Sequence, residues 1–469
     1  MDGHSASETD ASRLLELQRA AHARDGSPSV RVRRDRLHRL TDIVRDGAKD
    51  FAKAISDDFG HRPAFETALL ETVVTLNAAR YARKQVGWWM QTSPAEIDYT
   101  FWPGAAWVRH EPMGVIGIVS PWNYPLQLAL SPLVDVLAAG NRAIIKPSEQ
   151  TPKFSELLRE KISKAFAEEE VAVVTGGPEA AAAFTKLPFD HLVFTGSTAI
   201  GRKVAAAAAE GLMPVTLELG GKSPAIICPS ASVPKAVKAI TYGKFVNAGQ
   251  TCIAPDYVLA PRSKAIEVAE MVVAESRRAY PDVGDDYASM ISDRAFDRMT
   301  TAIAEAELGG AKVLRHPAPS DRSRRILPPV VVLDAPQDCV LMQEEIFGPV
   351  LPVIGYDALE DALDWVNSHP HPLALYVFAE DRKEQETVLA GTHSGGVTIN
   401  GTLLHIAQEG LPFGGVGPSG MGHYHGRAGF ERFTHARAVF RTGWFNAANM
   451  LAPPYGKKAR RMLKFLMMR

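Results

Sequence analysis

The feature that most constrains this chain is a series of short apolar runs that begins near Met113. The runs GVIGIV, RAIIK, VAVV, HLVFTG, PVTLELGG and SPAIIC are bounded by Gly, Pro or polar residues and alternate with Ala- and Leu-rich helical stretches. Runs of this kind are typical of strands that are buried on both faces. Strands that alternate with helices predict an α/β protein with parallel sheets.

Length and composition narrow the class of protein further. A chain of 469 residues exceeds one ordinary core and predicts two to three domains. The formal net charge of −1 gives no general electrostatic attraction to nucleic acid. Three cysteines without a CxxC pair argue against a disulfide framework or a zinc site and suit a reducing cytoplasm. No apolar stretch approaches the roughly 20 residues of a spanning helix, so we expect a cytoplasmic protein without membrane insertion.

The segments outside the α/β pattern are predicted as follows. The residues before Val32 are expected to be mobile, and residues 32–59 show the apolar spacing of one or two amphipathic helices. Residues 94–112 are aromatic and resemble a hairpin that turns at Pro103 and Gly104. The Gly-rich stretch 410–429 is predicted to be an ordered loop, because Phe, Val and Tyr interrupt its glycines.

The end of the chain, KKARRMLKFLMMR, is basic and partly amphipathic. A membrane-surface or nucleotide-binding role is conceivable for such a segment. A solvated or partner-docked tail is favoured, because one short tail gives marginal affinity by itself.

Cys252 is the candidate nucleophile. It lies in FVNAGQTCIAP, among small polar residues, whereas Cys228 and Cys339 lie in segments that indicate packing. A thiolate attacks a carbonyl readily and later leaves from a thioester. An unperturbed thiol with a pKa of about 8.5 is mostly protonated at neutral pH, so a base or a positive dipole must help it.

Three further segments offer weaker signals. Glu218 follows a buried strand in VTLELGG, where a strand end presents side chains to a cleft, although a surface glutamate at a turn fits equally well. Asn123 in SPWNYP has an amide that can stabilise an oxyanion or simply form a turn. The GSTAIG turn, which begins at Gly196, matches neither a P-loop nor GxGxxG, and is a possible phosphate cradle or an ordinary strand–turn–helix.

Seven motifs in a fixed order carry a family resemblance. PWNYP, KPSE, FTGSTAIG, LELGGKSP, GQTC, EEIFGP and LPFGGVGPSG follow one another over residues 121–420. Together they resemble the aldehyde dehydrogenase superfamily over essentially the whole chain. GQTCIAPDYVL and SGMGHYHGRAGF are similar to its class 3 branch, and within it to the bacterial coniferyl aldehyde dehydrogenases.

The resemblance implies roles for single residues. Cys252 resembles the nucleophile, Glu218 the glutamate that activates water, and Asn123 the amide that forms the oxyanion hole with a backbone N–H. Lys146 and Glu345 resemble residues that hold ribose hydroxyls. The full set that the resemblance places around the cofactor is Trp122, Lys146, Pro147, Glu149, Thr195, Gly196, Ser197, Glu345 and Phe347.

The same resemblance implies the cofactor and the class of substrate. A carboxylate at Glu149 should repel the 2′-phosphate of NADP, so NAD is preferred, while Arg202 and Lys203 leave NADP as an alternative. An apolar or aromatic aldehyde, such as coniferyl aldehyde, suits the residues expected in the substrate tunnel. Those residues are Tyr124, Leu128, Ile253 and His405. Gly401 stands where relatives carry an acidic residue, so the tunnel mouth is expected to differ.

These inferences predict a complete architecture. A Rossmann-like cofactor-binding domain is expected over residues 1–93 and 113–219, and an α/β catalytic domain over residues 220–405. A small β bridging element of residues 94–112 and 406–445 is expected to pair with a partner subunit in a homodimer, followed by the basic tail 446–469. No metal is implied. Two other functions stay open, namely a CoA-acylating or thioesterase-type relative and a non-catalytic scaffold.

Overall fold

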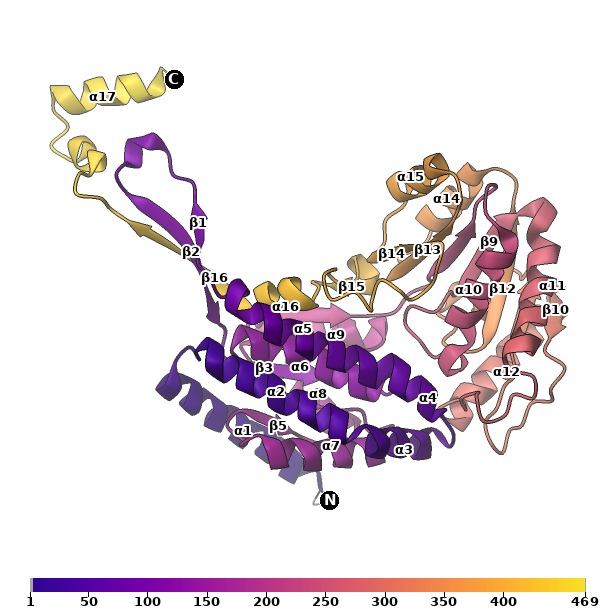
Figure 1. Ribbon diagram of the computed structural model, residues 1–469. Helices are drawn as coiled ribbons and strands as arrows, with labels where there is room; N and C mark the ends of the chain where they lie inside the picture. The colour runs from indigo at the N-terminus through magenta and orange to yellow at the C-terminus, as the bar shows by residue number, and fades with distance from the viewer. Residues whose placement is uncertain (1–2, 469) are drawn as a thin grey trace.

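The computed structural model describes residues 3–468 and contains three separate sheets. Two of them are mainly parallel and carry helices, and the third forms an arm that projects from the body (Figure 1). The α/β class with parallel sheets that the sequence predicts is therefore confirmed. The domain boundaries given above stay predictions.

The first sheet has six strands, and all of its neighbours are parallel except β15. Its central strands are completely buried, which explains why the sequence shows continuous apolar runs instead of alternation. Its strands in spatial order are β15 (Gly420–Met421), β7 (Val215–Glu218), β6 (His191–Thr195), β3 (Val115–Val119), β4 (Arg142–Lys146) and β5 (Val171–Val173).

Helices cover both faces of this sheet. On one face α6 packs on β3 and β4, and an outer layer that includes α2 and α5 packs on α6; on the other face lies α1 (Figure 1). The helices around the first sheet are α1 (Gly3–Asp25), α2 (Val30–Asp46), α3 (Ala48–Phe59), α4 (Ala64–Thr67), the π-helix η1 (Ala68–Val73), α5 (Val74–Trp89), α6 (Pro125–Ala139), α7 (Pro152–Ala165), α8 (Pro178–Phe184), α9 (Thr198–Glu210) and α16 (Gly426–Arg432).

The prediction of a mobile start is wrong for the described residues. From Gly3 onward the chain forms α1, which buries Ala11, Leu14 and Leu15 near the sheet. Gln18 on the same helix donates hydrogen bonds to the carbonyls of Ala143 and Glu168. These apolar and polar contacts stabilise a helix whose polar first residues gave no sign of it.

The second sheet has seven strands, parallel except for β10. α10 and α11 pack together, and α14 and α15 contact β12 and β13. Its strands in spatial order are β10 (Lys312–Arg315), β11 (Val330–Leu333), β12 (Val350–Tyr356), β9 (Tyr257–Pro261), β8 (Pro224–Ile227), β13 (Ala374–Phe378) and β14 (Gly396–Ile399). Its helices are α10 (Val233–Phe245), the 3-10 turn η3 (Val246–Gly249), α11 (Arg262–Ala279), α12 (Asp293–Leu308), α13 (Val340–Gln343), α14 (Leu359–Asn367) and α15 (Arg382–Gly391).

The arm is the third sheet. β2 (Ala105–Pro112) pairs antiparallel with the short β1 (Ser93–Ala95) on one side and with β16 (Thr434–Arg441) on the other. The loop between β1 and β2 contains the 3-10 turn η2 (Tyr99–Phe101). Beyond β16 the chain continues through η5 (Ala447–Leu451) into α17 (Lys457–Met467) at the end of the arm (Figure 1).

A fully buried ion pair joins the outer helices to the core around the first sheet. Arg62 donates to Glu71 at 2.7 Å, and both side chains have no exposed surface. The other carboxylate oxygen of Glu71 accepts the backbone N–H groups of Leu126 and Gln127 at the start of α6. Glu71 lies in the π-helical segment η1, a distortion that is frequent near functional sites. The pair therefore anchors α6 and the turn that precedes it.

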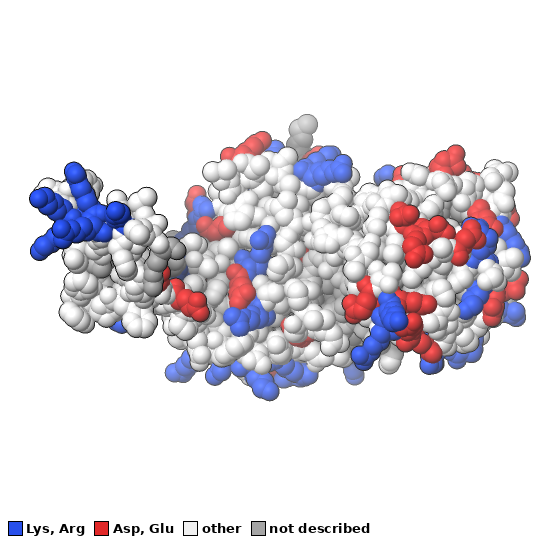
Figure 2. All heavy atoms as spheres, turned by 90° about the horizontal axis from the view of Figure 1, so that it is seen from above, with Lys and Arg blue, Asp and Glu red and all other residues white. Residues whose placement is uncertain are grey.

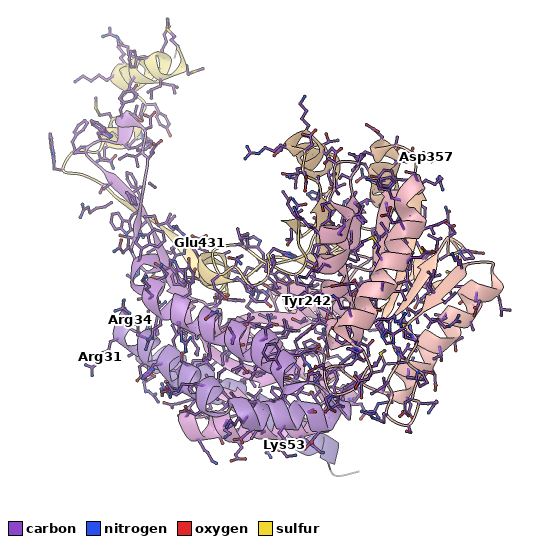
Figure 3. All side chains as sticks on the ribbon, turned by 45° about the vertical axis from the view of Figure 1, so that its right-hand side comes forward. Arg31, Arg34, Lys53, Tyr242, Asp357 and Glu431 are labelled. Carbon is purple, nitrogen blue, oxygen red and sulfur yellow. The ribbon has the colours of Figure 1, made fainter. Side chains whose placement is uncertain are left out.

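We predict that Glu71→Gln destabilises the protein strongly, because it leaves the buried Arg62 cation without its counter-charge. The expected loss is roughly 3–5 kcal/mol in the free energy of unfolding, measured by urea denaturation. The matched control is Asp57→Asn, which removes the exposed partner of Lys53 at the outer surface of α3 (Figure 3). That change should cost no more than about 1 kcal/mol. Equal stability of the two variants would contradict the assignment.

Candidate active site

The site lies where the strand order of the first sheet reverses. After β3 the chain moves to β4 and β5 on one side, and β6 and β7 then lie on the other side of β3. Ligands of open α/β sheets bind at the carboxyl ends of the strands at such a point. Asn123 follows β3, Thr195 ends β6 and Glu218 ends β7, so three predicted residues come together there.

A cavity of about 290 Å³ occupies this position. Most of the residues predicted for the site lie in its wall, together with residues from the second sheet and from the C-terminal segment. Its lining residues are Pro121, Trp122, Asn123, Leu128, Thr195, Gly196, Ser197, Glu218, Leu219, Gly220, Cys252, Glu345, Phe347, Leu373, Phe413 and Tyr424.

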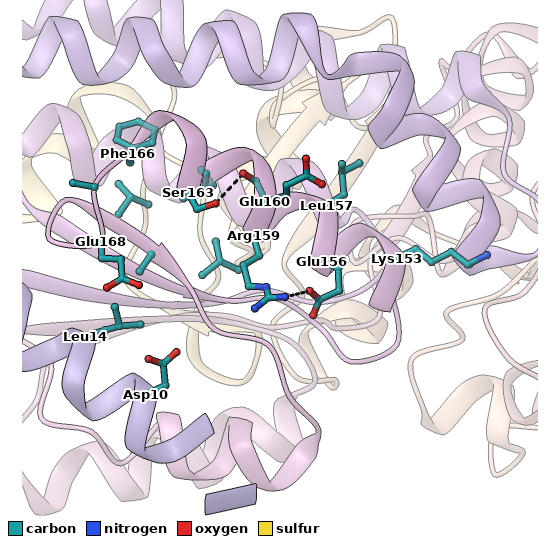
Figure 4. A pocket seen from close by; sticks show the side chains of 15 residues that line it. Asp10, Leu14, Lys153, Glu156, Leu157, Arg159, Glu160, Ser163, Phe166 and Glu168 are labelled. Atoms are coloured by element: carbon teal, nitrogen blue, oxygen red, sulfur yellow. Dashed lines mark hydrogen bonds and ion pairs between the residues drawn. The ribbon is translucent and has the colours of Figure 1, made fainter. Parts of the chain in front are cut away.

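A larger cavity of about 790 Å³ lies between α1, α7 and β5, with Glu168 and Asp10 at its edge (Figure 4). Its described lining contains no thiol, and its Arg159 and Glu156 form an ion pair with each other. The smaller cavity is therefore the candidate active site.

A strained turn brings the thiol of Cys252 into the cavity. Asn247 and Ala248 have φ values of 52° and 51°, in the left-handed region that costs energy for residues with a Cβ. Gly249 follows with φ of 73°, and a Cβ there would lie 2.3 Å from the carbonyl oxygen of Gly348. The glycine is required because the segment that carries Phe347 passes directly over this turn.

Cys252 is half-buried and surrounded by groups that oppose its ionisation. Burial, and after it the nearby carboxyl groups of Glu345 and Glu218, together raise the pKa of its thiol to about 12. The backbone N–H groups of Cys252 and Ile253 stabilise the thiolate and act in the opposite direction. In this state Cys252 is a protonated thiol at neutral pH, and a nearby positive charge or the removal of a negative one would lower its pKa.

Glu218 is a buried carboxyl group without a hydrogen-bond partner for either oxygen among the described residues. Burial raises its pKa well above the ordinary value, and only the positive charge of Arg432 opposes this. Arg432 is held in place by the hydroxyl of Thr216 and the carbonyl of Val215 on the same strand. A carboxyl group with a raised proton affinity is suited to general base chemistry near neutral pH.

The amide of Asn123 is held in place by the loop that carries Cys252. It donates to the carbonyl of Gln250 at 3.2 Å, and its own backbone carbonyl accepts from Asn247 and from Arg62. One amide N–H of Asn123 is engaged in this way, and the residue lines the cavity beside Cys252. The second N–H can therefore donate to an oxygen that develops negative charge there.

The opposite wall has the properties of a dinucleotide site. Thr195, Gly196 and Ser197 lead into the N-terminus of α9, whose free backbone N–H groups attract anions. The hydroxyl of Thr195 and one carboxylate oxygen of Glu345 are buried and have no hydrogen-bond partner within the part of the chain that the structure describes. These orphaned polar groups are available to a ligand that reaches this wall.

One close approach at a glycine and one contact between two aromatic rings shape this wall. A Cβ on Gly220 would lie 2.1 Å from the carboxylate of Glu345, so only glycine permits that approach. The rings of Trp122 and Phe347 meet edge to face, with centroids 5.5 Å apart. The sequence pattern ELGG thus supplies the carboxyl group of Glu218 and, at Gly220, the space that the carboxylate of Glu345 occupies.

Six predicted residues do not line this cavity. Lys146, Pro147 and Glu149 lie at and beyond the end of β4, one strand away. Lys146 is buried and donates to the carbonyl of Pro147 at 2.8 Å, whereas Glu149 is exposed. Their proposed contacts with a cofactor stay predictions.

Tyr124, Ile253 and His405 are buried behind the wall. The hydroxyl of Tyr124 bonds to Thr251 at 2.7 Å, and the carbonyl of Ile253 accepts from a buried tyrosine, Tyr376. His405 bonds to Thr398, and burial lowers its pKa to about 4. Their assignment to a substrate tunnel stays a prediction.

The site also contains residues that the sequence did not point to. Phe413 and Tyr424 come from the glycine-rich segment and exchange two backbone hydrogen bonds of 2.9 Å each. The next residue, His425, donates its N–H to the buried Asp135 on α6. The aromatic residues between the glycines were the available signal, because exposed loops seldom carry them.

Comparison with known proteins agrees with this geometry. The aldehyde dehydrogenase family matches residues 1–439. A probable coniferyl aldehyde dehydrogenase of Pseudomonas aeruginosa is 46% identical over 458 residues, which cover 97% of this chain and 96% of that protein. A dimeric NADP-preferring aldehyde dehydrogenase of Canis lupus familiaris is 35% identical over 430 residues, with 91% and 93% covered.

A solved structure extends the agreement to three dimensions. The substrate-bound state of Staphylococcus aureus AldH superimposes with a TM-score of 0.92 at 34% identity, and covers 97% of this chain and 99% of its own. Family match, identity and fold agree over nearly the whole length. The chain belongs to the aldehyde dehydrogenase family and is an NAD(P)-dependent enzyme that oxidises aldehydes.

Proposed function

We propose that Cys252 is the nucleophile with which this enzyme converts an aldehyde to its carboxylic acid through a thioester. The observation that carries the proposal is the shared cavity. Cys252, Asn123 and Glu218 line it together with the N-terminal turn of α9. A thiol, an amide donor, a strong carboxylate base and an anion-binding helix end form the set that this reaction needs.

The first step is addition of the Cys252 thiolate to the carbonyl carbon. The former carbonyl oxygen becomes an oxyanion, which accepts hydrogen bonds from the Asn123 amide and from backbone N–H groups of the nucleophile loop. One such donor typically contributes on the order of 10²–10³ in rate. The hydrogen bond from Asn123 to Gln250 fixes the amide before the substrate arrives.

The proposed cofactor site uses the opposite wall. Thr195, Gly196 and Ser197 would bind the pyrophosphate, and Glu345 would bind a ribose through its orphaned oxygen. Bound NAD supplies the acceptor for the hydride that leaves the substrate carbon. Lys146 and Glu149 at the end of β4 would hold the second ribose. Because Glu149 is an exposed carboxylate, it disfavours a 2′-phosphate, and we propose NAD as the preferred cofactor with NADP as the weaker one.

In the last step Glu218 takes a proton from water, and the resulting hydroxide attacks the thioester to release the acid. The raised pKa of Glu218 increases its strength as a base at neutral pH. The presence of Glu218 also favours water over CoA as the acceptor of the acyl group, so the product is a free acid.

The proposed substrate is an apolar or aromatic aldehyde of the coniferyl type. Leu128, Leu219 and Phe413 line the cavity, and it contains no Lys or Arg among its described lining residues. A second carboxylate on the substrate would therefore find no partner. The similarity to coniferyl aldehyde dehydrogenases supports the same choice.

We also propose a cytoplasmic homodimer. The three cysteines are free, as is usual in a reducing compartment. In the three-stranded arm β2 is the central strand, so β16 is one edge strand and the very short β1 is the other, and so small a sheet needs further packing. A partner subunit that covers the arm near the body would provide it.

The central test is Cys252→Ser, which should abolish NADH formation with any aldehyde and leave NAD binding intact. The hydroxyl is a far weaker nucleophile than a thiolate, while the cofactor wall is unchanged. NADH absorbance measures turnover, and calorimetric titration measures binding. The control is Cys339→Ser at the N-cap of α13. Serine is favoured at helix N-caps, so this variant should fold normally and keep full activity. Turnover by Cys252→Ser would refute the mechanism.

Glu218→Gln should slow release of the acid more than formation of the first NADH. Stopped-flow absorbance should show a burst of about one NADH per site, followed by a steady-state rate reduced about 10²–10⁴-fold. Glu210→Gln, an exposed carboxylate at the end of α9, is the control and should keep the normal rate. A normal steady-state rate in Glu218→Gln would remove this residue from the mechanism.

Reactivity of the thiol should depend on pH in a defined way. Because the pKa of Cys252 is about 12, alkylation by iodoacetamide without cofactor should rise about tenfold per pH unit from pH 7 to 10. Glu345 has a pKa of about 8 and is charged only above it. Glu345→Gln should therefore accelerate alkylation above pH 8 and change little below, measured by mass spectrometry of the Cys252 peptide.

The control for this experiment is Glu344→Gln. Glu344 is the residue next to Glu345. Its side chain is 62% exposed, and its carboxylate is not among the groups that raise the pKa of Cys252. A plateau in the rate near pH 8 would contradict the raised pKa of Cys252, and equal effects of the two glutamine variants would show that Glu345 does not control the thiol.

A further inference from the structure

The end of the chain differs in charge from the rest of the protein. From Arg432 to Arg469 the sequence contains no Asp or Glu, although the net charge of the whole chain is −1. Five of the basic residues lie on α17, namely Lys457, Lys458, Arg460, Arg461 and Lys464. None of these five forms an ion pair within the described part of the chain. Figure 2 shows them as a group at the end of the arm.

α17 is also strongly amphipathic. Ala459, Met462 and Leu466 repeat at helical spacing on one stripe, where Ala459 is buried and the other two are half-buried. Leu463 and Met467 continue the same stripe but remain 52% and 77% exposed. The helix contacts η5 with part of its apolar face, and the rest of that face has no cover within the described residues.

The neighbouring turns extend the apolar surface. η5 contacts both α17 and η2, so the tip of the hairpin lies beside the helix (Figure 1). Three further aromatic residues, Trp102, Trp444 and Tyr455, are 66%, 92% and 65% exposed there. We call this surface the arm tip, and it consists of η2 with Trp102, residues 444–455 and α17. It combines exposed aromatic rings, an apolar stripe and unpaired cations.

We propose that the arm tip binds the surface of an anionic lipid membrane. Leu463 and Met467 would enter the acyl boundary, the aromatic rings would lie at the headgroup level, and the five cations would contact lipid phosphates. A nucleic acid would satisfy the cations but leave the apolar stripe in water. No described helix is long and apolar enough to cross a membrane, so the contact is peripheral.

The proposed contact places the enzyme next to a phase in which apolar aldehydes dissolve. It does not depend on the catalytic assignment, because the arm tip lies at the far end of the projecting arm (Figure 1) and shares no residue with the lining of the cavity. An anionic leaflet attracts basic segments within about a Debye length, so binding is expected to weaken with salt.

The test is sedimentation of the full-length enzyme with vesicles. Binding is expected to vesicles that contain phosphatidylglycerol, and not to phosphatidylcholine alone. Lys458→Glu with Arg461→Glu should reduce the partition coefficient about tenfold or more. Leu463→Gln with Met467→Gln should reduce it similarly, because the apolar contribution is lost. Lys49→Glu with Lys84→Glu, two exposed lysines on α3 and α5, is the charge-matched control and should bind as the wild type does.

Three outcomes would overturn the proposal. They are no sedimentation with anionic vesicles, equal sedimentation with neutral ones, and a change of oligomeric state in the α17 variants without any lipid effect. The last outcome, measured by light scattering, would assign the arm tip to a subunit contact. NADH formation from a water-soluble aldehyde should be normal in all of these variants, and it tests the catalytic proposal separately.

Discussion

The convergence of three parallel strand ends at one edge of a sheet is the constraint on which the rest of this enzyme depends. Parallel strands all point their carboxyl ends the same way, so residues that follow β3, β6 and β7 must meet. The consequence is that Cys252 and Glu218 are shielded from water. Burial raises the pKa of both groups, because their charged forms are not solvated there. The same burial makes each group reactive once a ligand restores its charge.

The second sheet with its helices and the outer helices of the first sheet hold this strand edge in place. The Arg62–Glu71 pair connects the outer helices to the start of α6, and Asn247 and Gln250 connect the turn at Asn123 to the loop that carries Cys252. On the other side, Lys222 donates to Asp256 and to the carbonyls of Leu341 and Glu344, which fixes the segment that carries Glu345. Each of the proposed catalytic groups is therefore fixed by elements distant in sequence.

The C-terminal part of the chain contributes to two separate regions. Its glycine-rich segment returns to the first sheet, where Gly420 pairs with Glu218 and Phe413 closes the cavity. With β16 the chain then leaves the body, and it ends in the basic arm tip. One length of chain thus completes the proposed catalytic wall and the proposed membrane contact, and α16 and the arm separate them (Figure 1).

The sequence by itself determined the α/β class, because strands buried on both faces need continuous apolar runs such as RAIIK and HLVFT. Its ordered motifs also determined the family and pointed to Cys252, Glu218 and Asn123. Only the tertiary structure decided which of the predicted residues share one cavity, and it added Phe413 and Tyr424. The helix at Gly3–Asp25 was likewise beyond the sequence, because its stability comes from contacts with distant strands rather than from its own polar residues. Local patterns fix strands and turns, whereas long-range packing alone fixes which of their ends meet.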